Sequence, residues 1–281
     1  MIIDGRTMAS EVLAHAKERA ALLARPPRVL ALVANETPAT KSYLTIKGKR
    51  AADADCVLEV RQFPESVSGE ELKSAITQSD ADAIIVQLPL PSGIDTKEIC
   101  DAIPVGKDAD VLSSAARARF EMKDLRNLSS SLLPPVVSAV REIFNKSNVD
   151  TKGKKAVVIG TGFLVGAPAA TWLAQQGAEV AVLTRKSGDL TAALRAADII
   201  VSGAGSPHLI KPEMLKQGVV LIDAGTSESN GTIAGDADPT CAEKCSIFTP
   251  VPGGVGPLAV ACLFANAVTL AEIRGHDTIQ A

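Results

Sequence analysis

The stretch Val157-Val158-Ile159-Gly160-Thr161-Gly162-Phe163-Leu164-Val165-Gly166 decides the fold of this 281-residue chain. It begins inside an apolar, β-branched run typical of a buried strand, and a helical pattern starts at Gly166. Glycines that follow a strand and open a helix are the context of a dinucleotide-binding loop. Gly160 permits the tight turn, Gly162 lets the backbone approach a ligand, and Gly166 allows close helix–strand packing. The spacing is one residue longer than the usual G-x-G-x-x-G, so a glycine-rich turn without a ligand stays open as the alternative.

Short apolar runs alternate with helical patterns on both sides of this loop. The runs predicted as strands are Val29–Val33, Val57–Phe63, Ala83–Gln87, Lys155–Ile159, Glu179–Leu183, Ile199–Ser202 and Val219–Asp223. The patterns predicted as helices between them are Thr7–Leu23, Pro38–Ala52, Gly69–Gln78, Gly166–Gln176 and Leu190–Ala196. Continuous apolar runs are expected of parallel strands buried on both faces. The alternation therefore predicts an α/β fold with parallel sheets.

The length predicts about two domains. A boundary is expected within Ser113–Pro135, which contains a serine triplet and a proline pair. A helix over Val136–Asn145 and a fresh strand at Lys155 follow, so the second half is predicted to be a self-contained nucleotide-binding domain. A last helix is predicted over Pro257–Ile273.

Composition excludes several classes of protein. With 29 Lys and Arg against 32 Asp and Glu, the formal charge of −3 lacks the positive field that holds nucleic acid or an anionic membrane. No apolar run is expected to reach the roughly 18 residues of a membrane span, and no signal peptide is recognised. Five cysteines without CxxC spacing favour a reduced, cytoplasmic setting. Cys241 and Cys245 could share a helical face as metal ligands, but buried small residues are the favoured interpretation, so no metal is expected.

The end of the strand after the glycine-rich loop discriminates between cofactors. An NAD site has an acid there for the ribose hydroxyls, whereas this chain has Thr184-Arg185-Lys186-Ser187. Two cations and two hydroxyls suit a 2′-phosphate and favour NADP. A solvated basic turn is the alternative.

Four other motifs offer groups for chemistry. Tyr43 and Lys47 lie four residues apart on one helix face, and a partly desolvated Lys can carry a proton. Gln87 ends a buried strand, where open α/β sheets place their ligands. Asp110, in Lys-Asp-Ala-Asp, could pair bidentately with an amidine-like ring edge. Thr249–Pro257, with three prolines and three glycines, is a stiff loop whose backbone can approach a ligand. Taken singly, each also fits a structural role: a surface Lys beside a half-buried Tyr, a capping Gln, a solvated acid, a turn.

Together these motifs resemble the methylenetetrahydrofolate dehydrogenase/cyclohydrolase family along essentially the whole chain. The match is most specific at Val86-Gln87-Leu88-Pro89-Leu90-Pro91 and at Thr249-Pro250-Val251-Pro252-Gly253-Gly254-Val255-Gly256-Pro257. The resemblance implies a folate-binding catalytic domain over residues 1–133, to which a C-terminal helix over 257–281 returns. It also implies a Rossmann-type NADP domain over 134–256, an active site in the cleft between the domains, and a homodimer formed by the nucleotide domains.

The resemblance further implies two reactions. NADP oxidises 5,10-methylenetetrahydrofolate, and water converts the methenyl product to 10-formyltetrahydrofolate. Lys47 would carry the proton, Gln87 would orient it, Tyr43 would pack along the p-aminobenzoyl group, and Asp110 would bind the pterin. Gly256 and Pro257 are implied to lie at the folate. The residues implied to hold the cofactor are Gly160, Thr161, Gly162, Val165, Gly166, Arg185, Lys186 and Thr226.

This sequence departs from the family pattern at several positions. Val111 replaces the glycine after the pterin-binding acid, and Leu112–Phe120 lacks the usual polar residues. Thr161 stands where Arg is frequent, and Leu132–Pro135 and Asp223–Ser227 differ from their family motifs. These changes leave two rival functions, a dehydrogenase of another reduced pterin and a nucleotide-binding module without catalysis. The presence of Lys47, Gln87 and Asp110 argues against the second.

Overall fold

The computed structural model of the chain describes residues 1–281 except 36–37, 123–131, 230–231 and 281. The side chains of residues 38–43, 228–229, 232 and 276–280 also lie outside the described part. The chain divides into two compact units. The five-stranded unit comprises Met1–Ala9 and Val136–Ala259, and the three-stranded unit comprises Ser10–Pro135 and Val260–Ala281.

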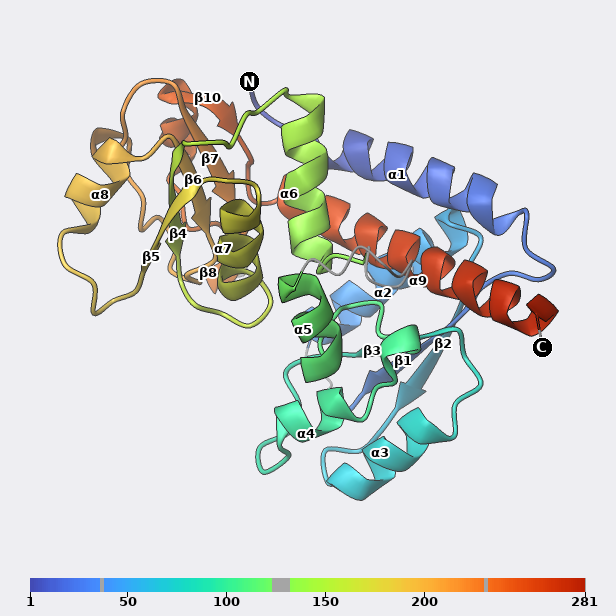
Figure 1. Cartoon of the computed structure of the whole chain (residues 1–281). Coiled ribbons are helices and arrows are strands. Elements are labelled where there is room, and N and C mark those ends of the chain that lie inside the picture. Colours follow the sequence, from blue (N-terminus) through green and yellow to red (C-terminus); the bar gives the residue numbers. More distant parts are fainter. Residues whose placement is uncertain (36–37, 123–131, 230–231, 281) are drawn as a thin grey trace. The chain divides into compact units, whose positions relative to one another are not determined.

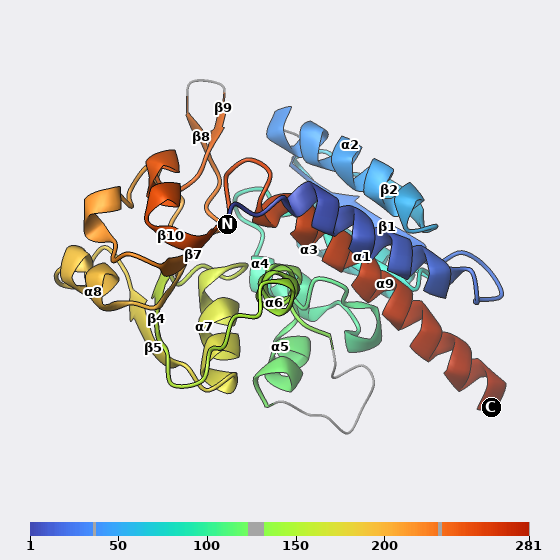
Figure 2. The ribbon, with the colours of Figure 1, turned by 90° about the horizontal axis from the view of Figure 1, so that it is seen from above.

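The three-stranded unit contains a parallel sheet of order β2-β1-β3, formed by Val57–Gln62, Arg28–Val33 and Ala83–Val86. Its helices include α2 (Pro38–Asp53), α3 (Gly69–Thr77), α4 (Thr96–Asp101) and α5 (Ser114–Glu121), together with a 3₁₀ turn, η1, over Val105–Lys107. Most of α1 (Gly5–Ala20) and of α9 (Val255–Gln280) belongs to it as well. Both views show α1, in blue, alongside α9, in red (Figures 1 and 2). The Arg19 guanidinium joins these helices through an ion pair with Glu272 and a 2.7 Å hydrogen bond to Thr269.

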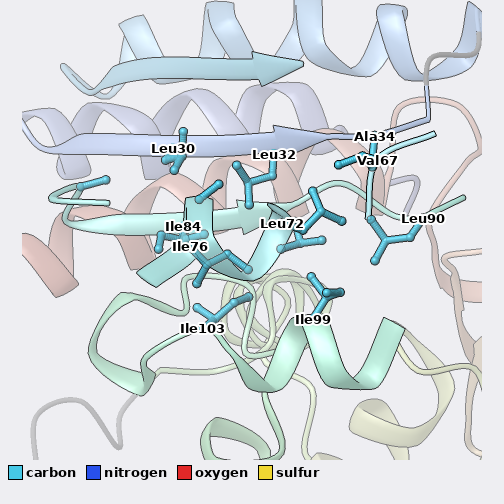
Figure 3. Packing of buried hydrophobic residues seen from close by; sticks show 13 residues of the cluster. Leu30, Leu32, Ala34, Val67, Leu72, Ile76, Ile84, Leu90, Ile99 and Ile103 are labelled. Atoms are coloured by element: carbon cyan, nitrogen blue, oxygen red, sulfur yellow. The ribbon is translucent and has the colours of Figure 1, made fainter. Parts of the chain in front are cut away.

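An aliphatic core joins this sheet to its helices. Leu30 and Leu32 of β1 and Ile84 of β3 pack against Leu72 and Ile76 of α3 (Figure 3). Each of these five side chains is at most 1% exposed. Each such buried side chain contributes roughly 1.5–3 kcal/mol. A chain poor in aromatic residues therefore still builds a rigid platform for the loops at the carboxyl ends of β1 and β3.

The five-stranded unit has a parallel sheet of order β10-β7-β6-β4-β5 (Figure 1). In chain order the strands are β4 (Lys155–Ile159), β5 (Glu179–Leu183), β6 (Ile199–Ser202), β7 (Val219–Asp223) and β10 (Cys245–Phe248). The helices α6 (Pro135–Lys146), α7 (Gly166–Gln175) and α8 (Leu190–Ala196) connect or precede them. An antiparallel hairpin of β8 (Ser227–Ser229) and β9 (Thr232–Ala234) follows β7 (Figure 2).

The predicted α/β class with parallel sheets is confirmed. However, the expectation that every apolar run is buried on both faces is wrong for β2 and β5, whose residues are largely exposed. Both strands lie at a sheet edge, which periodicity does not reveal. The strand β10, the β8–β9 hairpin and the short helices α4 and α5 were not expected, and α5 lies inside the predicted boundary stretch.

The expectation that no apolar run reaches the length of a membrane span is wrong. Within α9, Val255–Gly275 is long and apolar enough to cross a membrane by length and composition. More than half of its most apolar window is buried within the protein, and the polar residues Asn266 and Thr269 interrupt its apolar run. Core helices meet the same criterion, and Phe264 and Val268 of α9 are fully buried.

Candidate active site

Lys47 and Gln87 form the centre of the candidate site in the three-stranded unit. Lys47 lies on α2, and Gln87 directly follows β3. The ammonium Nζ of Lys47 donates a 2.8 Å hydrogen bond to Oε1 of Gln87. Nε2 of Gln87 donates to the carbonyl of Leu88 at 2.9 Å, which fixes the amide so that its oxygen faces the lysine. The two residues, 40 positions apart, are thus brought together as expected.

The environment of Lys47 favours its neutral form more than water does. Burial lowers the pKa of the Lys47 amine, and the negative charge of Asp110 opposes that shift. A lysine whose pKa approaches the working pH can both accept and return a proton. This electrostatic setting suits a proton carrier better than it suits a solvated surface lysine.

Asp110 is presented by a turn after η1. The buried carboxylate of Asp108 accepts hydrogen bonds from the backbone N–H groups of Leu112, at 3.0 Å, and Ser113, at 2.7 Å. Val111 within this turn has φ of 56°, a left-handed conformation that is strained for a β-branched residue. The backbone therefore keeps a conformation suited to glycine, although the residue is Val.

Burial raises the pKa of the Asp110 carboxyl to about 6, and the neighbouring Lys47 charge opposes this shift. Within the described part of the chain, none of the hydrogen bonds found goes to this carboxylate. A half-buried acid without such donors is suited to pair with the N–H donors of a ligand. Tyr43, the other residue expected here, lies on α2, and its side chain is outside the described part of the structure.

The glycine-rich loop of the five-stranded unit has the predicted strand–turn–helix context. Gly160 has φ of 98°, and a Cβ on Gly166 would lie 2.0 Å from the Gly160 carbonyl oxygen. A Cβ on Gly162 would meet only the carbonyl oxygen of Gly203, at 4.0 Å. Packing of the protein thus requires glycine at 166 but not at 162. The space in front of Gly162 is therefore open, and it lies next to the N-terminus of α7, which favours anions.

Val165, the N-cap of α7, packs against the next loop. A Cβ on Gly203 would lie 2.5 Å from Cγ1 of Val165. Val165 therefore supports the loop after β6, whereas Thr161 is exposed. Thr226 follows β7 and is exposed as well.

The basic turn after β5 is ordered by its own hydroxyls. The Thr184 N–H donates to Oγ of Ser187 at 2.9 Å, and the Lys186 N–H donates to Oγ1 of Thr184 at 3.2 Å. Arg185 and Lys186 are exposed, and Nη2 of Arg185 lies 3.4 Å from Oγ of Ser206. The structure therefore places one of the two cations beside the loop that follows β6.

No sequence motif indicates the group that orders the loop after β6. The buried carboxylate of Asp236 accepts 2.7 Å hydrogen bonds from the Ser202 hydroxyl and from the N–H groups of Ala204 and Ser206. A second buried acid, Asp223, has its pKa raised to about 6, mainly by burial. A side chain at Gly225 would collide with Asp236, and one at Gly235 would collide with Asp223. The sequence shows only that a glycine lies within two residues of each acid.

The proline-rich loop after β10 ends at α9. Thr249 is fully buried, and its hydroxyl Oγ1 accepts a 2.7 Å hydrogen bond from the Asp223 N–H. The helix begins at Val255, so Gly256 and Pro257 lie in its first turn, where proline is well tolerated. Cys241 and Cys245 lie around the start of β10, and Sγ of Cys241 donates to the Ile210 carbonyl at 3.4 Å.

Comparisons with known proteins agree along the whole chain. Residues 3–110 match the model of the tetrahydrofolate dehydrogenase/cyclohydrolase catalytic domain, and residues 134–275 match that of its NAD(P)-binding domain. The bifunctional protein FolD of a Hydrogenobaculum strain is 34% identical over 272 residues, covering 95% of this chain and 97% of the relative.

The solved structures similar to this one include two FolD enzymes. The bifunctional FolD dehydrogenase/cyclohydrolase of Campylobacter jejuni has a TM-score of 0.92 at 31% identity and covers 98% of this chain and 99% of its own. The FolD enzyme of Trypanosoma brucei, complexed with NADP cofactor and inhibitor, has a TM-score of 0.91 at 31% identity. It covers 100% of this chain and 99% of its own.

Proposed function

The chain belongs to the tetrahydrofolate dehydrogenase/cyclohydrolase family, and we propose that it is bifunctional: it oxidises 5,10-methylenetetrahydrofolate with NADP and hydrolyses the 5,10-methenyl product to 10-formyltetrahydrofolate. The observation that carries this proposal is the 2.8 Å hydrogen bond between Lys47 and Gln87, with Asp110 close enough to influence the lysine. In this pair, the amine of Lys47 is the proton carrier that the hydrolytic step requires.

The hydrolytic step follows from proton balance. Water attacks the methenyl carbon, and the neutral amine of Lys47 takes up the proton that the water loses. The ammonium then gives a proton to the folate N5 as its bond to that carbon breaks, and the collapsing hydroxyl releases its own proton to leave the formyl group on N10. One group cycling between acid and base serves both ends of this reaction.

The other residues of the three-stranded unit hold the substrate and the lysine. Gln87 accepts from Lys47 and aims its amine. We assign the Asp110 carboxylate to the pterin amino and ring N–H donors, because a carboxylate matches two parallel donors. Tyr43, one helical turn before Lys47, is assigned to the p-aminobenzoyl group. Gly256 and Pro257 belong to the five-stranded unit, and we assign them to folate binding on the family resemblance alone.

The residues of the five-stranded unit fit NADP. The loop leaves space at Gly162 beside the α7 N-terminus, and Arg185 with Lys186 supplies positive charge for a 2′-phosphate. When bound, NADP accepts the hydride from the methylene bridge. Residues Gly160–Gly166 would hold the pyrophosphate, Arg185 and Lys186 the 2′-phosphate, and Thr226 another part of the cofactor.

A direct assay tests the proposal. The purified protein is mixed with 5,10-methylenetetrahydrofolate and either NADP or NAD, and NADPH or NADH is followed by absorbance. We expect NADPH to form with NADP, and added methenyltetrahydrofolate to be hydrolysed faster than in buffer. Tight binding of NADP without turnover would leave only a nucleotide-binding module. Turnover of a different reduced pterin alone would assign another substrate.

We further propose that the protein is a cytoplasmic homodimer that pairs through β5. This strand is a sheet edge with Val182 41% exposed, and exposed edges favour pairing with a second chain. All five cysteines are free, which fits a reducing compartment, and the net charge of −3 disfavours nucleic acid and anionic membranes as partners. Sedimentation velocity should give a dimer for the wild type and a monomer for Val182→Lys. A monomeric wild type at micromolar concentration would contradict the dimer.

A further inference from the structure

Asn266 is a buried amide on the otherwise apolar inner face of α9. Its side chain is 8% exposed, and the neighbouring positions Cys262, Leu263, Ala267 and Leu270 are buried hydrophobic residues. Nδ2 of Asn266 donates two 2.9 Å hydrogen bonds, one to the carbonyl of Ala109 and one to the carbonyl of Leu133. Both partners are acceptors only, so the amide nitrogen must face them.

One of these bonds holds the turn that presents Asp110, and the other holds the segment before α6. The carbonyl of Ala109 belongs to the peptide unit that leads directly into Asp110, and Leu133 belongs to the segment entering α6. The turn is closed internally by Asp108 and linked to β3 by a bridge at Ile84. The hydrogen bond from Asn266 to the Ala109 carbonyl links this turn to α9. Since no hydrogen bond from the described residues was found to the Asp110 carboxylate itself, the backbone of the turn determines where that carboxylate lies.

We propose that Asn266 is a positioning residue for folate: it fixes the Ala109 carbonyl and thereby sets the Asp110 carboxylate where it meets the pterin. This inference rests on the proposed function. A buried amide that only stabilised the fold would affect folding alone. A positioning amide affects the binding of one of the two ligands, the reduced folate, and leaves NADP binding unchanged.

The experiment compares Asn266→Leu, which keeps the shape and removes both donors, with wild type. We expect the KM for 5,10-methylenetetrahydrofolate to rise about tenfold, the order of one lost charge-assisted contact. The KM for NADP should stay within twofold. Isothermal titration with tetrahydrofolate alone should show the same loss without any turnover. Asn266→Ser, which retains one small donor, should be intermediate, and it remains informative where Asn266→Leu does not fold.

Leu270→Ala is the matched control. Leu270 is buried one turn further along α9, is 1% exposed and forms no part of the proposed site. Its truncation should lower the melting temperature at least as much as Asn266→Leu, yet leave the folate KM unchanged. Equal folate KM values for wild type and both Asn266 variants would overturn the inference, as would a parallel rise in Leu270→Ala. An inactive wild type that still binds tetrahydrofolate would instead overturn the proposed function.

Discussion

At the scale of single residues, the site contains two ionisable side chains, Asp110 and Lys47, that are costly to bury and that a bound substrate would satisfy. Asp110 has a pKa raised to about 6 by burial, and Lys47 has a lowered pKa for the same reason. Both shifts mean that the free protein is less stable than it would be with neutral residues of similar shape. Perturbed titratable groups of this kind are typical of functional sites.

Asp110→Asn should therefore separate stability from function. Above pH 6 the wild type holds an ionised Asp110 that the fold disfavours. Its contribution to stability is fully present below the unfolded-state pKa, near 4, and is lost as the pH rises through 6. Relative to wild type, the variant should gain about 1–2 kcal/mol of unfolding free energy between pH 4.5 and 7.5. Urea unfolding at the two pH values measures this difference, and a variant that loses stability relative to wild type over that range would contradict it. The variant should also bind tetrahydrofolate at least about tenfold more weakly.

Val111→Gly tests the strain in the same turn. A β-branched residue at φ of 56° costs roughly 1–3 kcal/mol, and glycine removes that cost while losing buried contacts. The matched substitution Val201→Gly, in the fully buried strand β6, loses contacts without relieving strain. We expect Val111→Gly to be less destabilising by at least about 1 kcal/mol in urea unfolding. Equal losses would show that the left-handed turn stores no strain.

At the scale of elements, the sequence predicts the strands well but does not predict which strands lie next to one another in a sheet. The runs β4, β5, β6 and β7 have the predicted bounds because each is a short, uninterrupted apolar stretch. Sheet order is a tertiary property, so the exposed edges β2 and β5 could not be recognised. The strand β10 was missed because Cys245-Ser246-Ile247-Phe248 contains only a short apolar pair.

The basic turn after β5 is an element whose role can be isolated. Replacing Arg185 and Lys186 together by Ala should lower the ratio of kcat/KM for NADP to that for NAD by about tenfold or more. A charge-assisted phosphate contact of roughly 1.5–3 kcal/mol is lost. The control pair, Lys154→Ala with Lys155→Ala, lies at the opposite end of β4 and should leave the ratio unchanged. An unchanged ratio in the first variant would show that the turn does not discriminate the cofactors.

At the scale of the whole molecule, the sequence motifs were enough to indicate the family. The functional residues outside those motifs could be recognised only in the structure. Lys47, Gln87 and Asp110 could be selected from the sequence because each lies in a distinctive local pattern. Asn266 and Asp236 could not, because each binds backbone groups far away in sequence: 157 positions separate Asn266 from Ala109, and 32 separate Asp236 from Ala204. The apolar pattern of α9 also gave no sign of a polar role for this helix, although Asn266 is a buried amide among its buried hydrophobic side chains.

The two activities depend differently on Lys47, because hydride transfer needs alignment of two carbon atoms whereas hydrolysis needs a proton carrier. Lys47→Met keeps the length of the side chain and removes the amine. The nearby exposed Lys49→Met is the control on the same helix. NADP binding and tetrahydrofolate binding, measured by titration calorimetry, should remain largely intact in both variants.

The decisive measurement is the rate of methenyltetrahydrofolate hydrolysis, corrected for the buffer reaction, in wild type, Lys47→Met and Lys49→Met. We predict that Lys47→Met reduces this rate to the buffer background, that its dehydrogenase rate falls by a much smaller factor, and that Lys49→Met behaves as wild type. Hydrolysis by Lys47→Met at the wild-type rate would contradict the assignment of Lys47 as the proton carrier.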